Sequence, residues 1–484
     1  MLFNSISFAI FLPIVFVLYW FVANKTTRLQ NILLLAASYF FYACWDWRFL
    51  FLLIFSTLLD YFTGLKMFTS SNQAQRKTWF WLSIIVNLGF LGVFKYYNFF
   101  AHSFADALIH VGLHVDPWTL KVILPVGISF YTFHGLSYVI DIYKERITAE
   151  KNYIDYAVFV SFFPLLVAGP IERATHLLPQ IKKKRTFDYS MAVDGMRQIL
   201  WGLFKKIVIA DQSAVYANLV FNHSRDYSGS TLLLGAIFFT FQIYCDFSGY
   251  SDIALGTARL FGIDLLRNFA YPYFSRHIAE FWRRWHISLS TWFRDYLYIP
   301  LGGSKGGTAK KVRNTFIIFL VSGFWHGANW TFIVWGALNA LYIMPSIIFN
   351  TNRNNLDIVA GGKLFPTIKE FFQILMTFFL TVFAWIFFRA ANVQLAINFI
   401  KGIFTKAFFE FPYFPGIGSA KPFFILLVLF ILTEWSQREH QFALQFMGVN
   451  WARLWRWLFY SLIVFIIYYY SLSTNPQQFI YFQF

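Results

Sequence analysis

The sequence has little charge for its length. Of its 484 residues, 13% are charged and 58% are hydrophobic, and aromatic residues make up 23%. A soluble globular domain is about 25% charged. Because a folded chain of this size keeps much of its surface in contact with solvent, this composition excludes an ordinary water-soluble fold. It predicts a protein that spans a lipid bilayer.

Cysteine is also scarce. The two cysteines, Cys44 and Cys245, are far apart and lie in apolar surroundings, and neither belongs to a CxxC motif or to a cluster with histidine. This pattern excludes a disulfide framework and offers no zinc site. We therefore expect no bound metal.

Apolar runs follow one another along the whole chain. A membrane-spanning helix needs about 20 mostly apolar residues. The candidate runs lie near residues 5–23, 30–46, 48–67, 79–98, 120–143, 152–171, 195–221, 231–262, 313–349, 367–389, 420–436 and 454–472. The run at 313–349 is expected to hold two shorter elements, so the total is about eleven spans. The sequence predicts an all-α polytopic membrane protein that forms one integral membrane domain over residues 1–484.

The net charge of +17 lies in the gaps between the apolar runs. Short basic loops are typical of the cytoplasmic side of a membrane protein, where they face anionic lipid. No nucleic-acid recognition module accompanies the charge. We expect membrane lipid, and no nucleic acid, around this protein.

The run 152–171 is flanked by two basic clusters, at 144–151 and at 182–185. A single crossing would place these clusters on opposite sides of the membrane. Pro164 and the pair Gly169-Pro170 interrupt the run where a re-entrant segment would turn. We expect re-entry, and the alternative is that the charge rule fails here.

Two further segments are expected at the membrane surface. The stretch 104–116 has no lysine or arginine and suits a short interfacial helix, with an ordinary loop as the alternative. The segment 264–313 contains nine Lys or Arg residues against three Asp or Glu, interleaved with Trp and Tyr. It should lie at the cytoplasmic interface or dip into a protein-lined funnel.

Two histidines lie in unusual surroundings. His286 ends the run Trp282-Arg-Arg-Trp-His, and His326 lies in the apolar stretch Gly323–Trp330. An ionisable residue at membrane depth is costly and is therefore a functional candidate, although a lone histidine on an apolar helix can also be purely structural. A neutral imidazole can take a proton from a hydroxyl while that oxygen attacks a thioester. This chemistry is acyl transfer.

Several motifs together resemble one known family. They are Gln242–Asp252 (QIYCDFSGYSD), Phe281–Ser290 (FWRRWHISLS), Tyr296–Gly303 (YLYIPLGG) and Gly323–Trp330 (GFWHGANW). Jointly they are similar to the membrane-bound O-acyltransferase family, and the likeness covers most of the chain. The elements Ala168–Glu172 and Phe479–Phe484 resemble its bacterial alginate O-acetyltransferase branch.

The resemblance implies about eleven helices around a central tunnel in the bacterial inner membrane. His326 matches the essential histidine of the family, and His286 matches a second, upstream polar position. In this branch an acetyl group passes from cytoplasmic acetyl-CoA, a substrate and not a permanently bound cofactor, to a separate extracytoplasmic SGNH-hydrolase-like acetyltransferase. That partner then acetylates an alginate-like exopolysaccharide. His326 would be the general base, oriented and polarised by His286.

The cations near His286 are candidates for binding the acyl donor. Arg283, Arg284 and Arg294 are of the residue type that binds phosphate groups, and could attract the phosphates of coenzyme A. Their alternative role is to mark the cytoplasmic side. Asp246 and Asp252 lie in an apolar segment, and we expect them to pair with these arginines structurally rather than to act in catalysis.

Three other functions stay open at this point. Transfer of D-alanine to teichoic acid, with a carrier protein as donor, is the nearest alternative within the family. A transporter that uses the histidines as a proton relay would need paired broken helices in two corresponding halves, and no such repeat is evident. A scaffold for the outer transferase would tolerate the loss of both histidines.

Overall fold

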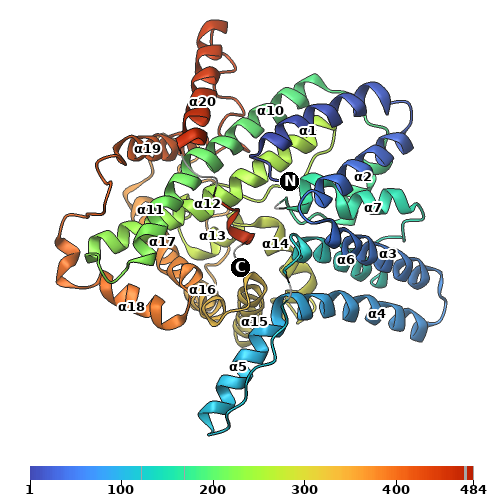
Figure 1. Ribbon diagram of the computed structural model, residues 1–484, viewed down its shortest axis with the longest axis horizontal. Helices are drawn as coiled ribbons and strands as arrows, with labels where there is room; N and C mark the ends of the chain where they lie inside the picture. Colours follow the sequence, from blue (N-terminus) through green and yellow to red (C-terminus); the bar gives the residue numbers. More distant parts are fainter. Residues whose placement is uncertain (122, 168, 474–476, 483–484) are drawn as a thin grey trace. The chain divides into compact units, whose positions relative to one another are not determined.

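All regular elements in the described part of the chain are helices (Figure 1). The computed structural model describes residues 1–121, 123–167, 169–473 and 477–482. Within these described ranges, six helices are long and apolar enough to cross a membrane: Trp47–Thr69, Gln73–His110, Gly229–Leu260, Trp330–Ile348, Ile368–Arg389 and Arg453–Leu472. The prediction of an all-α polytopic membrane protein is confirmed. The total of about eleven spans and the central tunnel stay predictions.

The chain separates into two compact units. The N-terminal unit comprises Met1–Ala192 and Thr257–Leu266, and the C-terminal unit comprises Val193–Gly256 and Arg267–Phe484. That residues 1–484 form one integral membrane domain stays a prediction.

Several helices of the N-terminal unit begin at polar capping residues. Its helices are α1 (Ile6–Val17), η1 (Leu18–Val22), α2 (Thr27–Ala43), α3 (Trp47–Thr69), α4 (Gln73–Leu91), η2 (Gly92–Tyr96), α5 (Tyr97–His110), α6 (Ile128–Tyr143), α7 (Tyr153–Ser161), α8 (Phe163–Leu166) and α9 (Ala174–Lys182). The side chains of Thr26 and Asp46 accept from the first-turn N–H groups of α2 and α3, which satisfies donors that have no partner within the helix. Helices α3, α4 and α6 pack side by side (Figure 1).

Two segments of this unit, 152–171 and 104–116, were expected to depart from simple membrane-spanning helices. The helix break in the run 152–171 is confirmed, because α7 ends at Ser161 and the four-residue α8 has Pro164 in its first turn. Re-entry itself stays a prediction, and Ala168 lies outside the described residues. In the stretch 104–116, residues up to His110 belong to α5, which begins at Tyr97 and follows α4 through the π-helical η2, and the residues beyond His110 leave the helix. The helix therefore begins earlier than expected, and its interfacial position stays a prediction.

The C-terminal unit combines helices of membrane-spanning length with several short ones. Its elements are η3 (Phe204–Ala210), α11 (Asp211–Asn222), η4 (Pro272–Phe274), α13 (Ile278–Arg284), α14 (Ile287–Phe293), η5 (Arg294–Tyr298), α15 (Thr308–His326), α16 (Trp330–Ile348), α17 (Ile368–Arg389), α18 (Val393–Ile403), η6 (Lys406–Phe409), α19 (Lys421–Ser436), α20 (Arg453–Ser473) and η7 (Ile480–Phe482). Two helices, α10 (Tyr189–Leu203) and α12 (Gly229–Leu260), begin in one unit and end in the other. Segment 264–313 forms only short helices before α15, and its cytoplasmic position stays a prediction.

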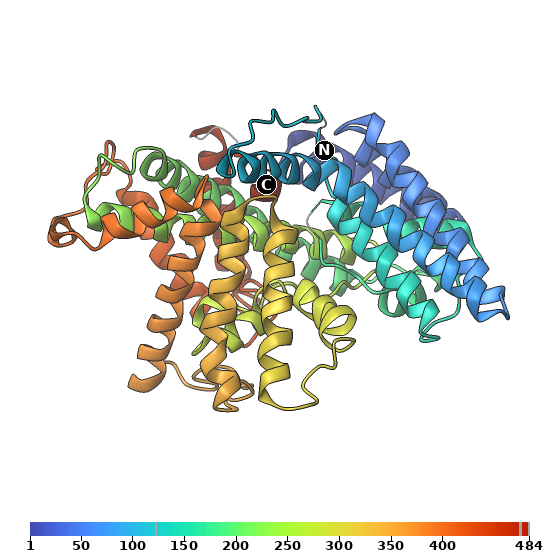
Figure 2. The same ribbon diagram turned by 90° about the horizontal axis from the view of Figure 1, so that it is seen from below.

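Helices α15, α16 and α17 lie side by side (Figure 2). The expectation of two elements within 313–349 is confirmed, since α15 and α16 are joined by a short turn. A Cβ on Gly323 would collide with the carbonyl of Phe332, and one on Gly336 with the carbonyl of Phe319. These glycines let the two backbones approach closely, as small residues do in membrane helix pairs. The end of α15 is therefore held rigidly against α16.

Candidate active site

His326 is the last residue of α15 and is 4% exposed. Aromatic rings surround its imidazole. The ring centroids lie 4.8 Å away for Trp325, 5.1 Å for Trp335, 5.3 Å for Phe388 and 5.7 Å for Tyr481. Trp335 comes from α16 and Phe388 from α17, so the packing of these helices shields the histidine from water.

His286 lies at the junction of α13 and α14 and is 1% exposed. Its backbone has a φ of 44°, in the left-handed region that residues with a Cβ seldom adopt. Neither ring nitrogen has a hydrogen-bond partner within the described ranges. Burial lowers the pKa of His286 to about 3, so the imidazole is neutral at pH 7. Such strain and unmet polar groups are features of functional positions.

The structure brings the two histidines into one aromatic cluster. The Trp325 ring lies 6.2 Å from that of His286 and 4.8 Å from that of His326. Phe247 on α12 contacts His286 at 4.7 Å and Tyr481 at 4.7 Å. No hydrogen bond joins the two imidazoles, because neither nitrogen of His286 has a partner among the residues described. The polarisation of His326 by His286 stays a prediction, and the link that the structure shows between them is their packing on the same Trp325 ring.

A C-terminal segment supplies a further ring to this cluster, that of Tyr481. The Ile480 N–H donates to Asp246 at 2.7 Å, and Lys206 Nζ donates to the Gln477 carbonyl at 3.1 Å. These bonds place Tyr481 beside the candidate base. Its hydroxyl is buried and has no hydrogen-bond partner in the described part of the chain. The closing aromatic motif was the sequence signal for this segment, and its residues 483 and 484 lie outside the described ranges.

Lysines, and not arginines, neutralise Asp246 and Asp252. Lys205 pairs with Asp252 at 2.5 Å, and Lys206 pairs with Asp246 and Asp211, each at 2.8 Å. The expected pairing of the aspartates with nearby arginines is therefore wrong. The physical reason is the π-helical η3, which turns two adjacent lysines inward. A π-bulge of this kind is frequent at functional sites, and two lysines in an apolar run were the signal that sequence reasoning missed.

The three arginines proposed for coenzyme A differ in accessibility. Arg283 donates to three carbonyls of the loop between α16 and α17, and Arg284 donates to one. Arg284 also pairs with Glu280 at 2.9 Å. Arg294 begins η5, is mostly exposed and donates to Asp295 at 2.8 Å. The first two hold a loop in place, and the third presents its guanidinium at the surface.

Comparison with known proteins identifies the family. The family model described as MBOAT, membrane-bound O-acyltransferase family, matches residues 143–387. The chain belongs to the membrane-bound O-acyltransferase family. Both candidate histidines lie within the matched range, and Tyr481 lies beyond it.

Curated relatives of this family match most of the chain. Proteins named probable alginate O-acetylase from Pseudomonas aeruginosa and Pseudomonas putida are 40% and 42% identical over 410 residues, which is 84% of this chain and 75% and 80% of theirs. The peptidoglycan O-acetyltransferase of Helicobacter pylori is 37% identical over 83% of this chain and 80% of its own length. The chain is thus a polytopic membrane O-acyltransferase.

Proposed function

We propose that this O-acyltransferase moves an acetyl group from cytoplasmic acetyl-CoA across the bacterial inner membrane to an extracytoplasmic SGNH-hydrolase-like acetyltransferase. That partner then O-acetylates an exopolysaccharide of the alginate type. The observation that carries the proposal is the burial of His286 and His326 in one aromatic cluster, inside the segment that matches the family. The relatives named alginate O-acetylases support the choice of acyl group and polymer.

His326 is the proposed general base. It takes the proton of the acceptor hydroxyl as the oxygen attacks the thioester carbonyl, the carbon–sulfur bond breaks, and the proton passes to the leaving thiolate. The surrounding rings exclude water, which favours transfer to the acceptor over hydrolysis. His286, neutral and packed on Trp325, keeps the site uncharged and holds that wall of it.

The donor is proposed to approach along the basic segment 264–313. Arg294 offers the most accessible guanidinium for a coenzyme A phosphate, and Arg283 and Arg284 add positive potential beside it. Acetyl-CoA is a substrate here, so no permanently bound cofactor is proposed.

A transfer assay tests the assignment of the base. The full-length protein would be reconstituted in vesicles with labelled acetyl-CoA inside, and the partner transferase with alginate oligosaccharides outside. His326→Gln should lower acetylation by roughly 10²–10⁴-fold, the usual contribution of general base catalysis. His223→Gln, a change at an exposed histidine, is the matched control. Wild-type acetylation by the His326 variant would remove this mechanism.

Two alternatives are separated by their donors and acceptors. The peptidoglycan O-acetyltransferase relative makes peptidoglycan fragments the second acceptor to assay. Teichoic acid D-alanyltransferase of Streptococcus thermophilus is 29% identical over only 50% of this chain, and a requirement for acetyl-CoA would exclude a carrier-protein donor.

Family membership favours acyl transfer over a histidine proton relay in a transporter. Loss of acetylation in a correctly assembled His326 variant would exclude a scaffold.

A further inference from the structure

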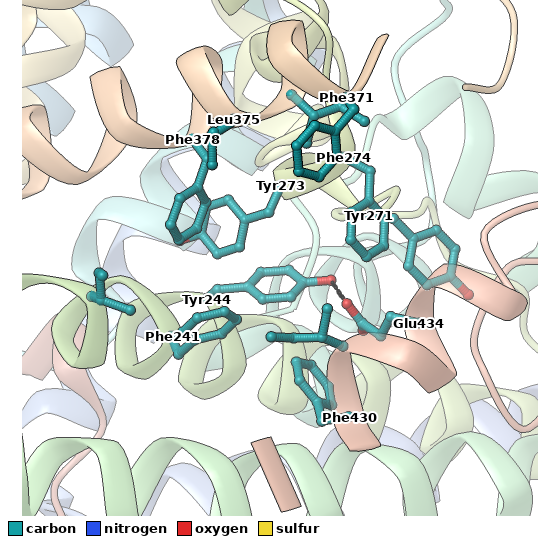
Figure 3. A pocket seen from close by; sticks show the side chains of 13 residues that line it. Phe241, Tyr244, Tyr271, Tyr273, Phe274, Phe371, Leu375, Phe378, Phe430 and Glu434 are labelled. Atoms are coloured by element: carbon teal, nitrogen blue, oxygen red, sulfur yellow. Dashed lines mark hydrogen bonds between the residues drawn. The ribbon is translucent and has the colours of Figure 1, made fainter. Parts of the chain in front are cut away.

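An apolar cavity of about 250 Å³ lies within the C-terminal unit (Figure 3). Rings from α17 and from the turn that contains η4 face rings from α12 and α19 across it. Its lining residues differ from those of the histidine cluster. The volume exceeds that of an engineered cavity of about 150 Å³ that holds benzene, and it is below the roughly 300–1,000 Å³ of a site for a whole small molecule. The cavity therefore suits part of a larger ligand.

The polar groups of the lining do not offer bonds to a ligand. The Tyr244 hydroxyl donates to the two carboxylate oxygens of Glu434 at 2.9 and 3.1 Å (Figure 3). The Tyr273 hydroxyl donates to the Thr240 carbonyl at 2.7 Å, and the Tyr271 hydroxyl points away from the cavity (Figure 3). A buried water needs two to four polar partners, and a polar ligand that finds no partners pays for its desolvation. The occupant that fits this lining is a hydrocarbon.

The cavity opens on the surface of a membrane helix. Phe371 and Leu375 on α17 both line it, and they are 53% and 39% exposed. Helix α17 is one of the helices that are long and apolar enough to cross a membrane. On α19, Ile431 lines the cavity and the next residue, Leu432, is exposed. Because the chain is a polytopic membrane protein, the opening between these two helices faces lipid.

The side chains around this opening favour lipid over a partner helix. The exposed positions near it are bulky, and they are Phe372 and Met376 on α17 and Val428, Leu429 and Leu432 on α19. Helices that pack together in a membrane usually meet through small residues, which let their backbones approach closely. Bulky side chains keep a neighbouring backbone at a distance, whereas a flexible lipid chain can pass between them.

We propose that this cavity binds one acyl chain of a bilayer phospholipid, whose head group stays at the membrane surface. The chain enters between α17 and α19 and lies against Phe378 on α17 and Phe241 on α12, whose ring centroids are 6.1 Å apart. Moving a chain from lipid into an equally apolar cavity gains little hydrophobic free energy. The stabilisation comes from van der Waals contacts between the chain and the lining rings.

Photolabelling of the full-length protein in phosphatidylcholine vesicles tests the proposal. The probe is phosphatidylcholine with a photoactivatable diazirine at the middle of one acyl chain, and labelled residues are mapped by mass spectrometry. Phe241 and Tyr244 should be labelled although they are only 7% and 2% exposed, because a chain inside the cavity reaches them and the surrounding lipid does not. Label confined to the exposed side chains of α17 and α19 would overturn the proposal and indicate ordinary contact with the bilayer.

Two variants at adjacent positions of α17 serve as a matched pair. Leu375→Trp fills the cavity and should lower the labelling of Phe241 and Tyr244 about fivefold or more. Met376→Trp, at an exposed position outside the lining, should leave it unchanged. Label on the exposed Leu432 measures total contact with lipid and should be equal in both variants. Unchanged labelling of Phe241 and Tyr244 in Leu375→Trp would contradict the assignment, and the distribution of label on the wild-type protein decides the question if that variant fails to fold.

Discussion

Two groups of buried ionisable side chains in the C-terminal unit differ in their partners. Lys206 is 1% exposed and pairs with Asp211 and Asp246. His286 is equally buried, but neither of its ring nitrogens has a partner in the described part of the chain. Removing a partner from a paired buried charge destabilises a fold. A buried polar group without a partner does not stabilise the fold, so its presence indicates a role other than stability. We therefore expect the first group to be structural and the second functional.

The largest effect is expected from the paired group. Lys206→Met leaves Asp211 and Asp246 without their cation and removes the donor to the Gln477 carbonyl. Breaking a buried pair costs about 3–5 kcal/mol, so the variant should unfold at a lower temperature and expose its C-terminal segment to protease. Thermal unfolding in detergent and limited proteolysis measure both. Lys406→Met, at an exposed lysine, should behave as wild type, and an equally stable Lys206 variant would show that the ion cluster does not hold the segment.

For His286 we expect the opposite result, which is a loss of activity without a loss of stability. His286→Asn should lower kcat about 10²-fold, the loss expected when a reacting group is displaced by a change in the residues that hold it. It should not lower stability, because asparagine tolerates the left-handed backbone at this position better than most residues. Transfer assays and thermal unfolding on the same preparation separate the two effects. A loss of stability with kcat unchanged would reverse our assignment of this residue.

The segment that carries Tyr481 contacts both the ion cluster and the histidine cluster. The ion cluster anchors its segment, and its ring lies beside His326. Tyr481→Phe removes only a hydroxyl that has no partner among the described residues, so stability should stay the same or rise slightly. If that hydroxyl positions the acceptor or the thioester, turnover should fall about tenfold, which corresponds to about 1.4 kcal/mol. Full activity in this variant would limit Tyr481 to a packing role.

The sequence predicts the architecture and the two histidines but not their surroundings. Apolar runs of sufficient length indicate membrane helices by themselves, and His326 stands out because its neighbours are apolar. The inward direction of Lys205 and Lys206 depends on the local π-helical winding of η3, which composition does not encode. Tyr481 lies far from His326 along the chain, and only tertiary packing brings them together. The break near Pro164 was predictable because proline acts locally.

The smallest effect tests a histidine that does have a partner. In the N-terminal unit, His176 Nδ1 lies 2.8 Å from Glu172 Oε2, and this bond raises the pKa of His176 above its ordinary 6.5. The stabilisation is complete below pH 6.5 and is lost as the pH rises through the raised pKa. Because the His176 side chain is 35% exposed, the pair contributes less than about 1 kcal/mol. His176→Asn should therefore flatten the shallow decline in melting temperature between about pH 6 and pH 8. An identical decline in the variant would assign it to other groups, and His286, neutral throughout this range, should make no contribution to it.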